Sequence, residues 1–450
     1  MLQGILLDKI MAAAILPHRE VETTEYRPPV PWTLRDTGLS QSMVEQLIFN
    51  TLYSRGELTG RNIADILGLS FSVIEPLMEE LKVRQQFEIK RSLGYGLISS
   101  VFTLSESGRK RARECYENNQ YVGPAPVPAS QYVTAVEAQK PPQGWLSRET
   151  LARAYRHVVL SKNTLSQIGP AVNSGKSLLM YGQPGNGKTY LAEALIKLES
   201  SAVFVPHAIE FNGSIIQFFD PLSHQPLAST DDSEDLFSLQ RPYDSRWVRC
   251  HRPFIVTGGE LTLEMLELSY NSSTKIYDAP RHLKANNGMY LIDDFGRQRV
   301  SPAELLNRWI VPMESRVDHL ILPTGGKLSL PFEVFLIFST NLNPDQLGDE
   351  AFLRRIQYKM MVQNPTREEF TQIFNNFCVA KKLDCPAGLV DHFIEQHYTK
   401  TGHPLRRCHP RDVISHAIDL MQFENLPHSL DEDVLRRGFE SCFTQFADQH

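Results

Sequence analysis

The chain lacks the features of a disulfide scaffold, a membrane protein and a strongly basic protein. Its six cysteines are scattered through 450 residues without a C-x-x-C pair, which excludes a disulfide framework and a typical zinc site and favours reduced thiols in a cytoplasmic protein. No apolar run reaches the roughly 18 residues that a membrane helix needs, so we expect no membrane insertion. A net charge of -6 argues against coating of nucleic acid by bulk charge, although it is compatible with a local basic surface.

The first 39 residues are predicted to be an extension ahead of the first domain. The stretch "MLQGILLDKIMAAAILPH" is apolar, but Asp8 and Lys9 interrupt it and no cationic segment precedes it. A signal peptide has a positive segment followed by an apolar core. We therefore expect an amphipathic helix within residues 1–39, or Met11 as the natural start.

Two helical patterns joined by a turn begin residues 40–118. The stretch "ELTGRNIADILGLSFSVIEPLMEEL" has apolar residues spaced for two packed helices that meet at Gly68. The next stretch, "FEIKRSLGYGLISSVFTLSESGRKRA", contains two strand-like runs and then a basic helix. Residues 40–118 therefore resemble a small α+β domain of the winged helix-turn-helix type.

Two uses of this predicted domain stay open. Its second helix would enter the major groove of DNA, yet it carries Glu75, Glu79 and Glu80, which phosphates repel. Basic side chains on the expected hairpin and last helix are available to phosphates, namely Lys90, Arg91, Arg109, Lys110, Arg111 and Arg113. We therefore favour docking of a protein on residues 40–118 and keep DNA binding as the alternative.

Residues 119–148 contain "GPAPVPAS" and "KPPQG". Because proline cannot occupy a helix interior without losing a hydrogen bond, this segment is predicted to be a semi-stiff, Pro-rich linker without a helix. Strand and helix patterns alternate in residues 149–365, whereas residues 366–450 show only helical patterns. The sequence therefore predicts an α/β domain with a parallel sheet, followed by a helical domain.

The strongest motif is "SLLMYGQPGNGKTYLAEALIKL", which completes the pattern G-x-x-x-x-G-K-[ST] between an apolar strand and a helical pattern. In this arrangement backbone N–H groups point at phosphate oxygens, the lysine neutralises the β- and γ-phosphates, and the threonine hydroxyl binds Mg²⁺. The predicted contacts with ATP are Gly182, Pro184, Gly185, Asn186, Gly187, Lys188, Thr189 and Tyr190.

Two adjacent carboxylates follow a second apolar strand in "GMYLIDDFGRQ". The run from Met289 to Ile292 is continuously apolar, as in a parallel sheet covered on both faces, and it leads into Asp293 and Asp294. Ligands bind at the carboxyl ends of such strands. A P-loop enzyme needs an aspartate there to hold Mg²⁺, so we assign the metal to Thr189 and Asp293 and the polarisation of water to Asp294.

These motifs make residues 145–450 resemble an AAA+ ATPase, with residues 149–365 as the ATPase core and residues 366–450 as its helical lid. "FLIFSTN" is a third apolar strand followed by Asn341, at the place of the family's sensor 1 asparagine. In "DEAFLRRI" the resemblance implies Arg355 as the arginine finger, with Arg354 as the alternative. "LRRCHPRDVISHAIDL" resembles the sensor 2 helix, with Arg411 at the helix start and aimed at the nucleotide.

The family's second acidic residue is most often glutamate, and Asp294 is one methylene shorter. The expected catalytic set is Lys188, Asp294, Asn341 and Arg355. Binding of ATP and Mg²⁺ does not depend on the length of Asp294. Hydrolysis does, because a general base must come within hydrogen-bond reach of the water, directly or through one more water.

Two hairpins are predicted around the second aspartate strand. "FNGSIIQFFDPLSHQPLASTDDSEDLFSL" indicates an inserted hairpin with an acidic loop. "DHLILPTGGKLSLPFEVFLIFSTN" indicates another, turning at Gly325 and Gly326 just before the sensor 1 strand. The second hairpin resembles that of the pre-sensor-1 hairpin, MoxR-like branch of AAA+ proteins.

The resemblance implies a ring of identical subunits, expected to be a hexamer, in which ATP binding and hydrolysis drive remodelling of a protein client. Two alternatives stay open. In the first, the chain is an ATP-dependent regulatory protein that binds DNA through residues 40–118. In the second, it is an ATP-gated assembly scaffold that hydrolyses ATP weakly.

Overall fold

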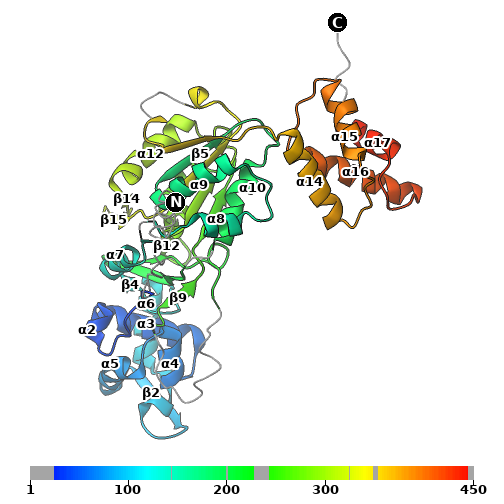
Figure 1. Ribbon diagram of the computed structural model, residues 1–450. Coiled ribbons are helices and arrows are strands. Elements are labelled where there is room, and N and C mark those ends of the chain that lie inside the picture. The colour runs from blue at the N-terminus through cyan, green and yellow to red at the C-terminus, as the bar shows by residue number, and fades with distance from the viewer. Residues whose placement is uncertain are drawn as a thin grey trace, which may run out of the picture.

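The computed structural model describes residues 25–142, 144–198, 201–227, 243–323, 325–347 and 353–443. Figure 1 shows three parts: a unit rich in helices at one end, a central α/β core, and a small helical lid at the side of the core. The amphipathic helix predicted near the N-terminus and the acidic loop predicted after residue 227 lie outside the described residues. Within the described ranges, no helix is both long and apolar enough to cross a membrane.

The N-terminal unit has its helices and strands in the order predicted from the sequence. Its elements are α2 (Leu34–Thr37), α3 (Gln41–Arg55), β1 (Leu58–Thr59), α4 (Gly60–Leu67), α5 (Phe71–Val83), β2 (Phe87–Ser92), β3 (Ser100–Leu104) and α6 (Glu106–Asn118). The hydroxyl groups of Ser40 and Thr59 cap α3 and α4, and Gly68 ends α4 in a left-handed conformation with a φ of 64°. β2 and β3 form the expected hairpin, and β1 pairs with the other edge of β3.

The central sheet consists of five parallel strands in the spatial order β10-β13-β16-β5-β17. The strands are β5 (Ser177–Tyr181), β10 (Phe254–Thr257), β13 (Met289–Ile292), β16 (Phe335–Thr340) and β17 (Tyr358–Met361). Every residue of β16 is buried, as expected for a central strand covered on both faces. Because β16 lies between β5 and β13, the loops that follow these three strands meet at one edge of the sheet.

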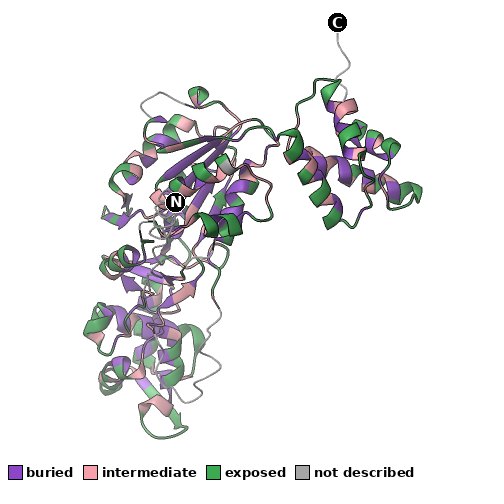
Figure 2. Cartoon of the chain, viewed as in Figure 1, coloured by how far each residue is buried: buried purple, intermediate pink, exposed green. Residues whose placement is uncertain are grey.

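Helices cover both faces of this sheet. They are α8 (Arg148–Ala154), α9 (Lys162–Ser174), α10 (Lys188–Glu193) with the 3₁₀ helix η2 (Ala194–Lys197), and α12 (Pro302–Ser315). α7 (Ala129–Ala138) contacts strands outside this sheet, and α11 (Arg281–Lys284) precedes β13 in the chain. Alternate residues of β5 point to opposite faces. Leu178 and Met180 pack in a cluster with α8, α9 and α10, whereas Leu179 packs in the cluster that contains Trp309 of α12. Figure 2 accordingly shows the strands buried between exposed helix surfaces.

The lid is a separate helical part with its own core. Its helices are α14 (Arg367–Ala380), α15 (Leu389–Ile394) continued by the π-helical turn η6 (Glu395–Thr399), α16 (His409–Glu424) and α17 (Glu432–Cys442). Phe370, Phe374, Phe393 and Val413 lie at the centre of its buried cluster. In Figure 1 the lid stands beside the core near α10.

A second sheet is built mainly from the insert between the P-loop and Asp293. Its strands, in spatial order, are β11 (Ser269–Asn271), β12 (Ile276–Asp278), β8 (Ser214–Gln217), β7 (Ala208–Phe211) and β4 (Val127–Pro128). β7 and β8 form the hairpin predicted for the insert, with Asn212 and Gly213 at positive φ in its turn. A separate antiparallel pair, β6 (Val203–Pro206) and β9 (Trp247–Cys250), flanks this hairpin along the chain.

The prediction of a helix-free linker over residues 119–148 was wrong for residues 127–138. β4 pairs with β7 at the edge of the second sheet, and α7 follows it directly. Pro124, Pro126 and Pro128 precede the helix, with Pro128 at its N-cap, where an N–H group is not required, and Pro141 and Pro142 follow it, so no proline lies inside α7. Inside α7, Tyr132, Ala135 and Val136 share one buried face, so apolar spacing decided the structure rather than proline content.

Arg246, a residue of the insert, contacts the N-terminal unit through an ion pair and hydrogen bonds. Its guanidinium pairs with Asp244 at 2.8 Å, and both side chains are 2% exposed. It also donates hydrogen bonds to the carbonyl oxygen of Thr37 in the N-terminal unit, at 3.0 Å, and to that of Pro126, at 3.4 Å. A buried ion pair needs such additional hydrogen bonds to offset the desolvation of its charges. The N-terminal unit is therefore packed on the core through a satisfied polar contact.

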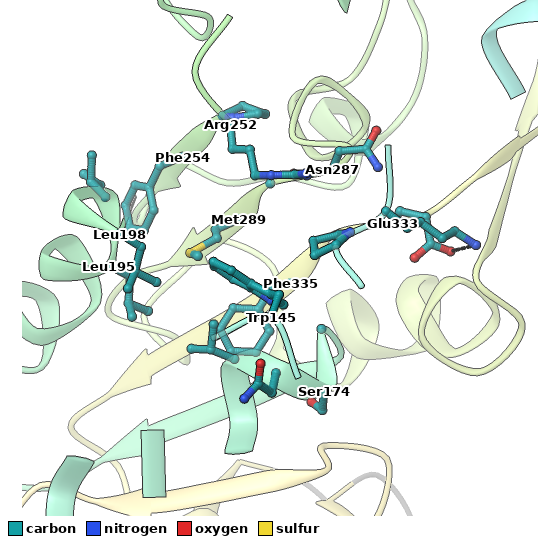
Figure 3. Close-up of a pocket in the computed structure, with 18 of the residues that line it drawn as sticks. Trp145, Ser174, Leu195, Leu198, Arg252, Phe254, Asn287, Met289, Glu333 and Phe335 are labelled. Atoms are coloured by element: carbon teal, nitrogen blue, oxygen red, sulfur yellow. Dashed lines mark hydrogen bonds and ion pairs between the residues drawn. The ribbon is translucent and has the colours of Figure 1, made fainter. Parts of the chain in front are cut away.

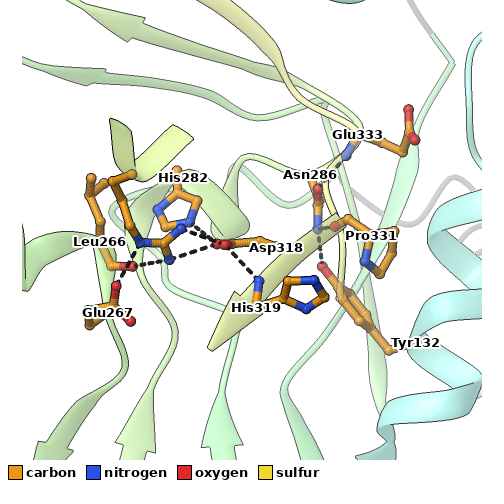
Figure 4. A network of polar contacts seen from close by, with 10 residues as sticks. Tyr132, Leu266, Glu267, His282, Asn286, Asp318, His319, Pro331 and Glu333 are labelled. Carbon is orange, nitrogen blue, oxygen red and sulfur yellow. Dashed lines mark hydrogen bonds and ion pairs between the residues drawn. The ribbon is translucent and has the colours of Figure 1, made fainter. Parts of the chain in front are cut away.

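The hairpin predicted before the sensor 1 strand is present as β14 (Val317–Ile321) and β15 (Lys327–Pro331). Asp318 of β14 is fully buried and accepts hydrogen bonds from His282 Nε2 at 2.6 Å and from Arg308 Nη1 at 2.7 Å (Figure 4). Burial alone would raise the pKa of Asp318, but hydrogen bonds and electrostatic attraction from His282 and Arg308 lower the pKa to about 2. This network joins the hairpin to α11 and α12.

Asp318 is expected to make the free energy of unfolding of the core depend on pH in the acid range. Its pKa is lowered from 3.8 to about 2 by folding, so its contribution to the free energy of unfolding is complete above pH 3.8 and is lost as the pH falls toward 2. A pKa change of this size corresponds to about 2 kcal/mol. Urea unfolding above and below this interval, followed by tryptophan fluorescence, measures the loss, because the Trp309 ring lies 6.4 Å from that of His282. Asp318→Asn has no carboxyl group at this position and should lose less stability over the same interval; an equal loss would contradict the assignment.

Candidate nucleotide-binding site

The loop between β5 and α10 needs its glycines for both backbone conformation and space. Gly182, Gly185 and Gly187 have φ values of 143°, 82° and 78°, in the region that favours glycine. A Cβ atom on Gly182 would lie 2.5 Å from the carbonyl oxygen of Val362, and one on Gly185 would lie 2.6 Å from Cys408 Sγ. The loop is thus held closely between the core and the lid segment that precedes α16.

Lys188 lies at the start of α10 and is 7% exposed. Its ammonium donates hydrogen bonds to the carbonyl oxygens of Gly182 and Gln183, at 2.9 and 3.1 Å, and to Asn341 Oδ1 at 2.6 Å. Burial lowers the pKa of Lys188, and the nearby carboxylates of Asp293 and Asp294 oppose this only in part. An ammonium held by neutral oxygens is well suited to an incoming phosphate.

Thr189 and Asp293 meet at the carboxyl edge of the sheet. Thr189 Oγ1 donates to Asp293 Oδ2 at 2.8 Å, so the hydroxyl of the glycine loop and the carboxylate after β13 lie side by side. Hydroxyl and carboxylate oxygens are the ligands that Mg²⁺ prefers, and a magnesium site uses only a few protein ligands together with substrate phosphates. This pair therefore fits the metal predicted for it.

Asp294 and Asn341 extend the same group of polar side chains. Asn341 Nδ2 donates to Asp294 Oδ1 at 3.1 Å while its Oδ1 accepts from Lys188, so hydrogen bonds link the three side chains in a row. Asp294 has a φ of 48°, a left-handed conformation that is uncommon outside glycine, and its backbone N–H donates to Asp293 Oδ1 at 3.0 Å. The two adjacent carboxylates thereby point in different directions.

The remaining predicted loop residues take different positions. Asn186 is 1% exposed and donates to Asn364 Oδ1 at 2.7 Å, so its side chain braces the loop from within the protein. Tyr190 is half exposed and packs edge-on against the ring of His157. Pro184 contributes its carbonyl oxygen, which accepts a hydrogen bond from Arg406 Nη1 at 2.5 Å.

The two arginines predicted from the family pattern do not join this group. Arg355 Nε donates to Glu314 Oε1 of α12 at 2.7 Å. Arg411 lies at the start of α16, as predicted, but its side chain is 65% exposed and pairs with Asp412 at 2.8 Å instead of pointing at the glycine loop. The electrostatic reason is local, because a carboxylate one residue away is the nearest partner for an arginine on an exposed helix end.

Arg406, which was not predicted from the sequence, is a lid arginine that contacts the glycine loop. The backbone N–H of Cys408 donates to the carbonyl oxygen of Gly185 at 2.9 Å, which brings the lid segment onto the loop and places Arg406 beside Pro184. The neighbouring Arg407 is directed elsewhere, donating to the carbonyl oxygen of Val159 at 2.6 Å. The only signal in the sequence was the Arg-Arg pair ahead of α16, which does not distinguish these positions from Arg411.

The five-stranded parallel sheet, the glycine loop after β5 and the helical part that follows form an α/β core with a helical lid, which confirms the α/β fold class predicted from the sequence. Within the chain, residues 366–441 match a family described as a domain of unknown function, DUF8689. No curated protein matches the chain.

Solved structures show distant likenesses. NtrX from Brucella abortus shares 11% identity, with 66% of this chain and 58% of that chain covered and a TM-score of 0.39, so this chain spans less than two thirds of NtrX. A RuvB variant from Thermotoga maritima shares 13% identity, with 67% of this chain and 72% of that chain covered and a TM-score of 0.34. The Thermotoga maritima RuvB Holliday junction branch migration motor shares 12% identity at the same coverage and TM-score.

Proposed function

We propose that this chain is a Mg²⁺-dependent ATPase that assembles into a ring of its own copies, expected to be a hexamer, and remodels a protein client. One observation carries the proposal: hydrogen bonds link Lys188, Asn341 and Asp294 in a row beside the Thr189–Asp293 pair. Mg²⁺-bound ATP supplies the phosphoanhydride bond that is cleaved. All other chemistry falls to side chains of the protein.

Each side chain of this group has a distinct part in the proposed reaction. Lys188 exchanges its neutral oxygen partners for phosphate oxygens, and Thr189 and Asp293 hold the metal. Asn341 and Asp294 orient the attacking water, and the carboxylate takes its proton. Arg406 supplies positive charge next to the glycine loop.

The arginine finger assigned to Arg355 requires a second subunit. In one chain Arg355 pairs with Glu314, and the Arg355 side chain is 31% exposed. An arginine at the surface of one subunit can exchange a carboxylate partner for the phosphate of a neighbour, which completes the site only in an assembly. The weak-hydrolysis scaffold remains the alternative, since the short Asp294 side chain is engaged by Asn341 rather than reaching outward.

The N-terminal unit favours a protein partner over DNA. The tip of its β2–β3 hairpin exposes Leu93 and Tyr95, at 67% and 100%, and apolar side chains of this kind suit protein contacts. On α6, Arg111 and Arg113 are already paired with Glu114 and Glu117. The DNA-binding alternative is supported by Arg109 and Lys110 of this helix, which line a hollow between α6, α3 and β3.

Steady-state ATP turnover at increasing protein concentration tests the proposal. Turnover per subunit should rise with concentration, because the finger comes from a neighbour, and Arg355→Ala should reduce turnover by about a thousandfold. Arg354→Ala, at the alternative finger position one residue away, should retain activity, and a loss in Arg354→Ala alone would move the finger to Arg354. Turnover that is independent of concentration and of both substitutions would contradict a shared site.

The same assay separates the alternatives. If the wild type hydrolyses no ATP while Asp294→Glu does, the chain is an ATP-gated scaffold whose short carboxylate limits hydrolysis. Duplex DNA that binds the protein in a salt-dependent way and changes its turnover would instead favour the regulatory alternative.

A further inference from the structure

A pocket of about 190 Å³ lies at the amino-terminal edge of the central sheet, remote from the glycine loop (Figure 3). Phe254, Met289 and Phe335, the first residues of β10, β13 and β16, form its floor, whereas the nucleotide site is built where β13 and β16 end. The rest of its apolar wall comes from Trp145, Val172, Leu195, Ile196 and Leu198. An apolar cavity of this size accommodates a single six-membered ring.

Arg252 is the polar group that makes this pocket unusual. Its guanidinium donates to the carbonyl oxygens of Asn287 and Gln139, at 2.6 and 2.9 Å, and to Ser201 Oγ at 2.9 Å. All of these acceptors are neutral, and across the described parts of the chain no carboxylate pairs with Arg252. Burial lowers the pKa of Arg252 to about 10.

Glu333 is the one carboxylate among the described residues that line the pocket, and it already pairs with two basic side chains. Glu333 pairs with Lys140 at 2.9 Å and with Arg316 at 3.0 Å, and its side chain is only 12% exposed. The lining contains Lys140, Arg252 and Arg316, and Lys140 also pairs with Glu137, so these cations exceed their carboxylate partners by one charge, that of Arg252. This excess of positive charge beside an apolar wall is complementary to a ligand with one anionic group and one apolar body.

We propose that this pocket binds a small apolar carboxylate, with its ring or short aliphatic body among Phe254, Met289 and Phe335 and its carboxylate on Arg252. The guanidinium has five N–H groups and the contacts above engage three of them, so Nε and Nη1 can still donate to a carboxylate. This site is independent of ATP binding and of the proposed ATPase function.

Calorimetric titration of the full chain with benzoate tests the proposal. Benzoate should bind saturably, benzamide should bind at least tenfold more weakly because it keeps the ring and loses the charge, and acetate should bind weakly because it lacks the ring. Arg252→Gln should weaken benzoate binding at least tenfold, whereas Arg55→Gln, an exposed arginine in the N-terminal unit, should leave it unchanged. Benzamide binding as tightly as benzoate, or no saturation by benzoate at millimolar concentration, would overturn the proposal.

Arg252 also donates hydrogen bonds to backbone carbonyl oxygens, so a second variant tests the pocket while Arg252 stays in place. Ile196 is 55% exposed at the pocket, so Ile196→Trp should fill the entrance without disturbing the core and should abolish benzoate binding. Trp145 gives an independent readout, since its fluorescence should change with benzoate in the wild type and the change should disappear in Trp145→Phe. Benzoate binding that survives both Arg252→Gln and Ile196→Trp places the ligand elsewhere.

Discussion

Arg246→Met is expected to lower the free energy of unfolding by about 3–5 kcal/mol, because it leaves a buried carboxylate without its partner. Asp244 and Arg246 are each 2% exposed, so water cannot replace the lost contact. The substitution also removes the hydrogen bonds to Thr37 and Pro126 that attach the N-terminal unit to the insert. Denaturant unfolding followed by circular dichroism measures the loss, and limited proteolysis shows whether the N-terminal unit is released first.

Two variants serve as controls for this result. The double variant Asp244→Leu/Arg246→Met removes both charges and should recover most of the stability, since apolar replacement of a buried pair is often neutral. Arg113→Met breaks an exposed pair with Glu117 and should have little effect. A double variant as unstable as Arg246→Met would mean that the hydrogen bonds to Thr37 and Pro126, rather than the unpaired charge, dominate.

Lys188→Ala is expected to reduce ATP turnover by a hundredfold or more, because it removes the cation aimed at the phosphates. It should also weaken binding of a fluorescent ATP analogue. The thermal midpoint should stay close to that of the wild type. Folding lowers the pKa of Lys188, so the charged form is disfavoured in the folded chain, and alanine removes this cost together with the lysine's hydrogen bonds.

Lys197→Ala provides a matched comparison for this substitution. Lys197 lies about two helical turns further along, in η2, and is exposed. Its loss should leave both turnover and nucleotide binding unchanged. A Lys188→Ala protein that loses its fold along with its activity would show that the lysine is mainly structural.

Sequence reasoning succeeded where a function depends on neighbouring residues in the chain. The glycine loop and the apolar run before Asp293 are local patterns, and each fixes one strand and the residues at its end. Parallel pairing then follows from alternation of strands and helices, so the meeting of Thr189, Asp293 and Asn341 could be expected before any coordinates.

Contacts between segments that lie far apart in the chain could not be predicted from local patterns. Nothing local to Val127 and Pro128 indicates that β4 pairs with β7, whose residues Ile209 and Glu210 lie far along the chain. The contact of Arg406 with Pro184 depends on how the lid is placed, which periodicity does not encode. Asp244, the partner of Arg246, lies only two residues away in the chain, but the pair is buried because the N-terminal unit packs over it.

The shared core of the N-terminal unit and the insert decides how this protein can be divided or recombined. Ala208 and Ile215 of β7 and β8 belong to the same buried cluster as the helices of the N-terminal unit. A chain that begins after residue 118 would expose Ala208 and Ile215 to solvent. A chain that ends at residue 118 would lose these two residues from the core of its N-terminal unit. Exchange of the N-terminal unit between proteins of this kind therefore requires exchange of the β7–β8 hairpin as well, and the two segments are expected to be inherited together.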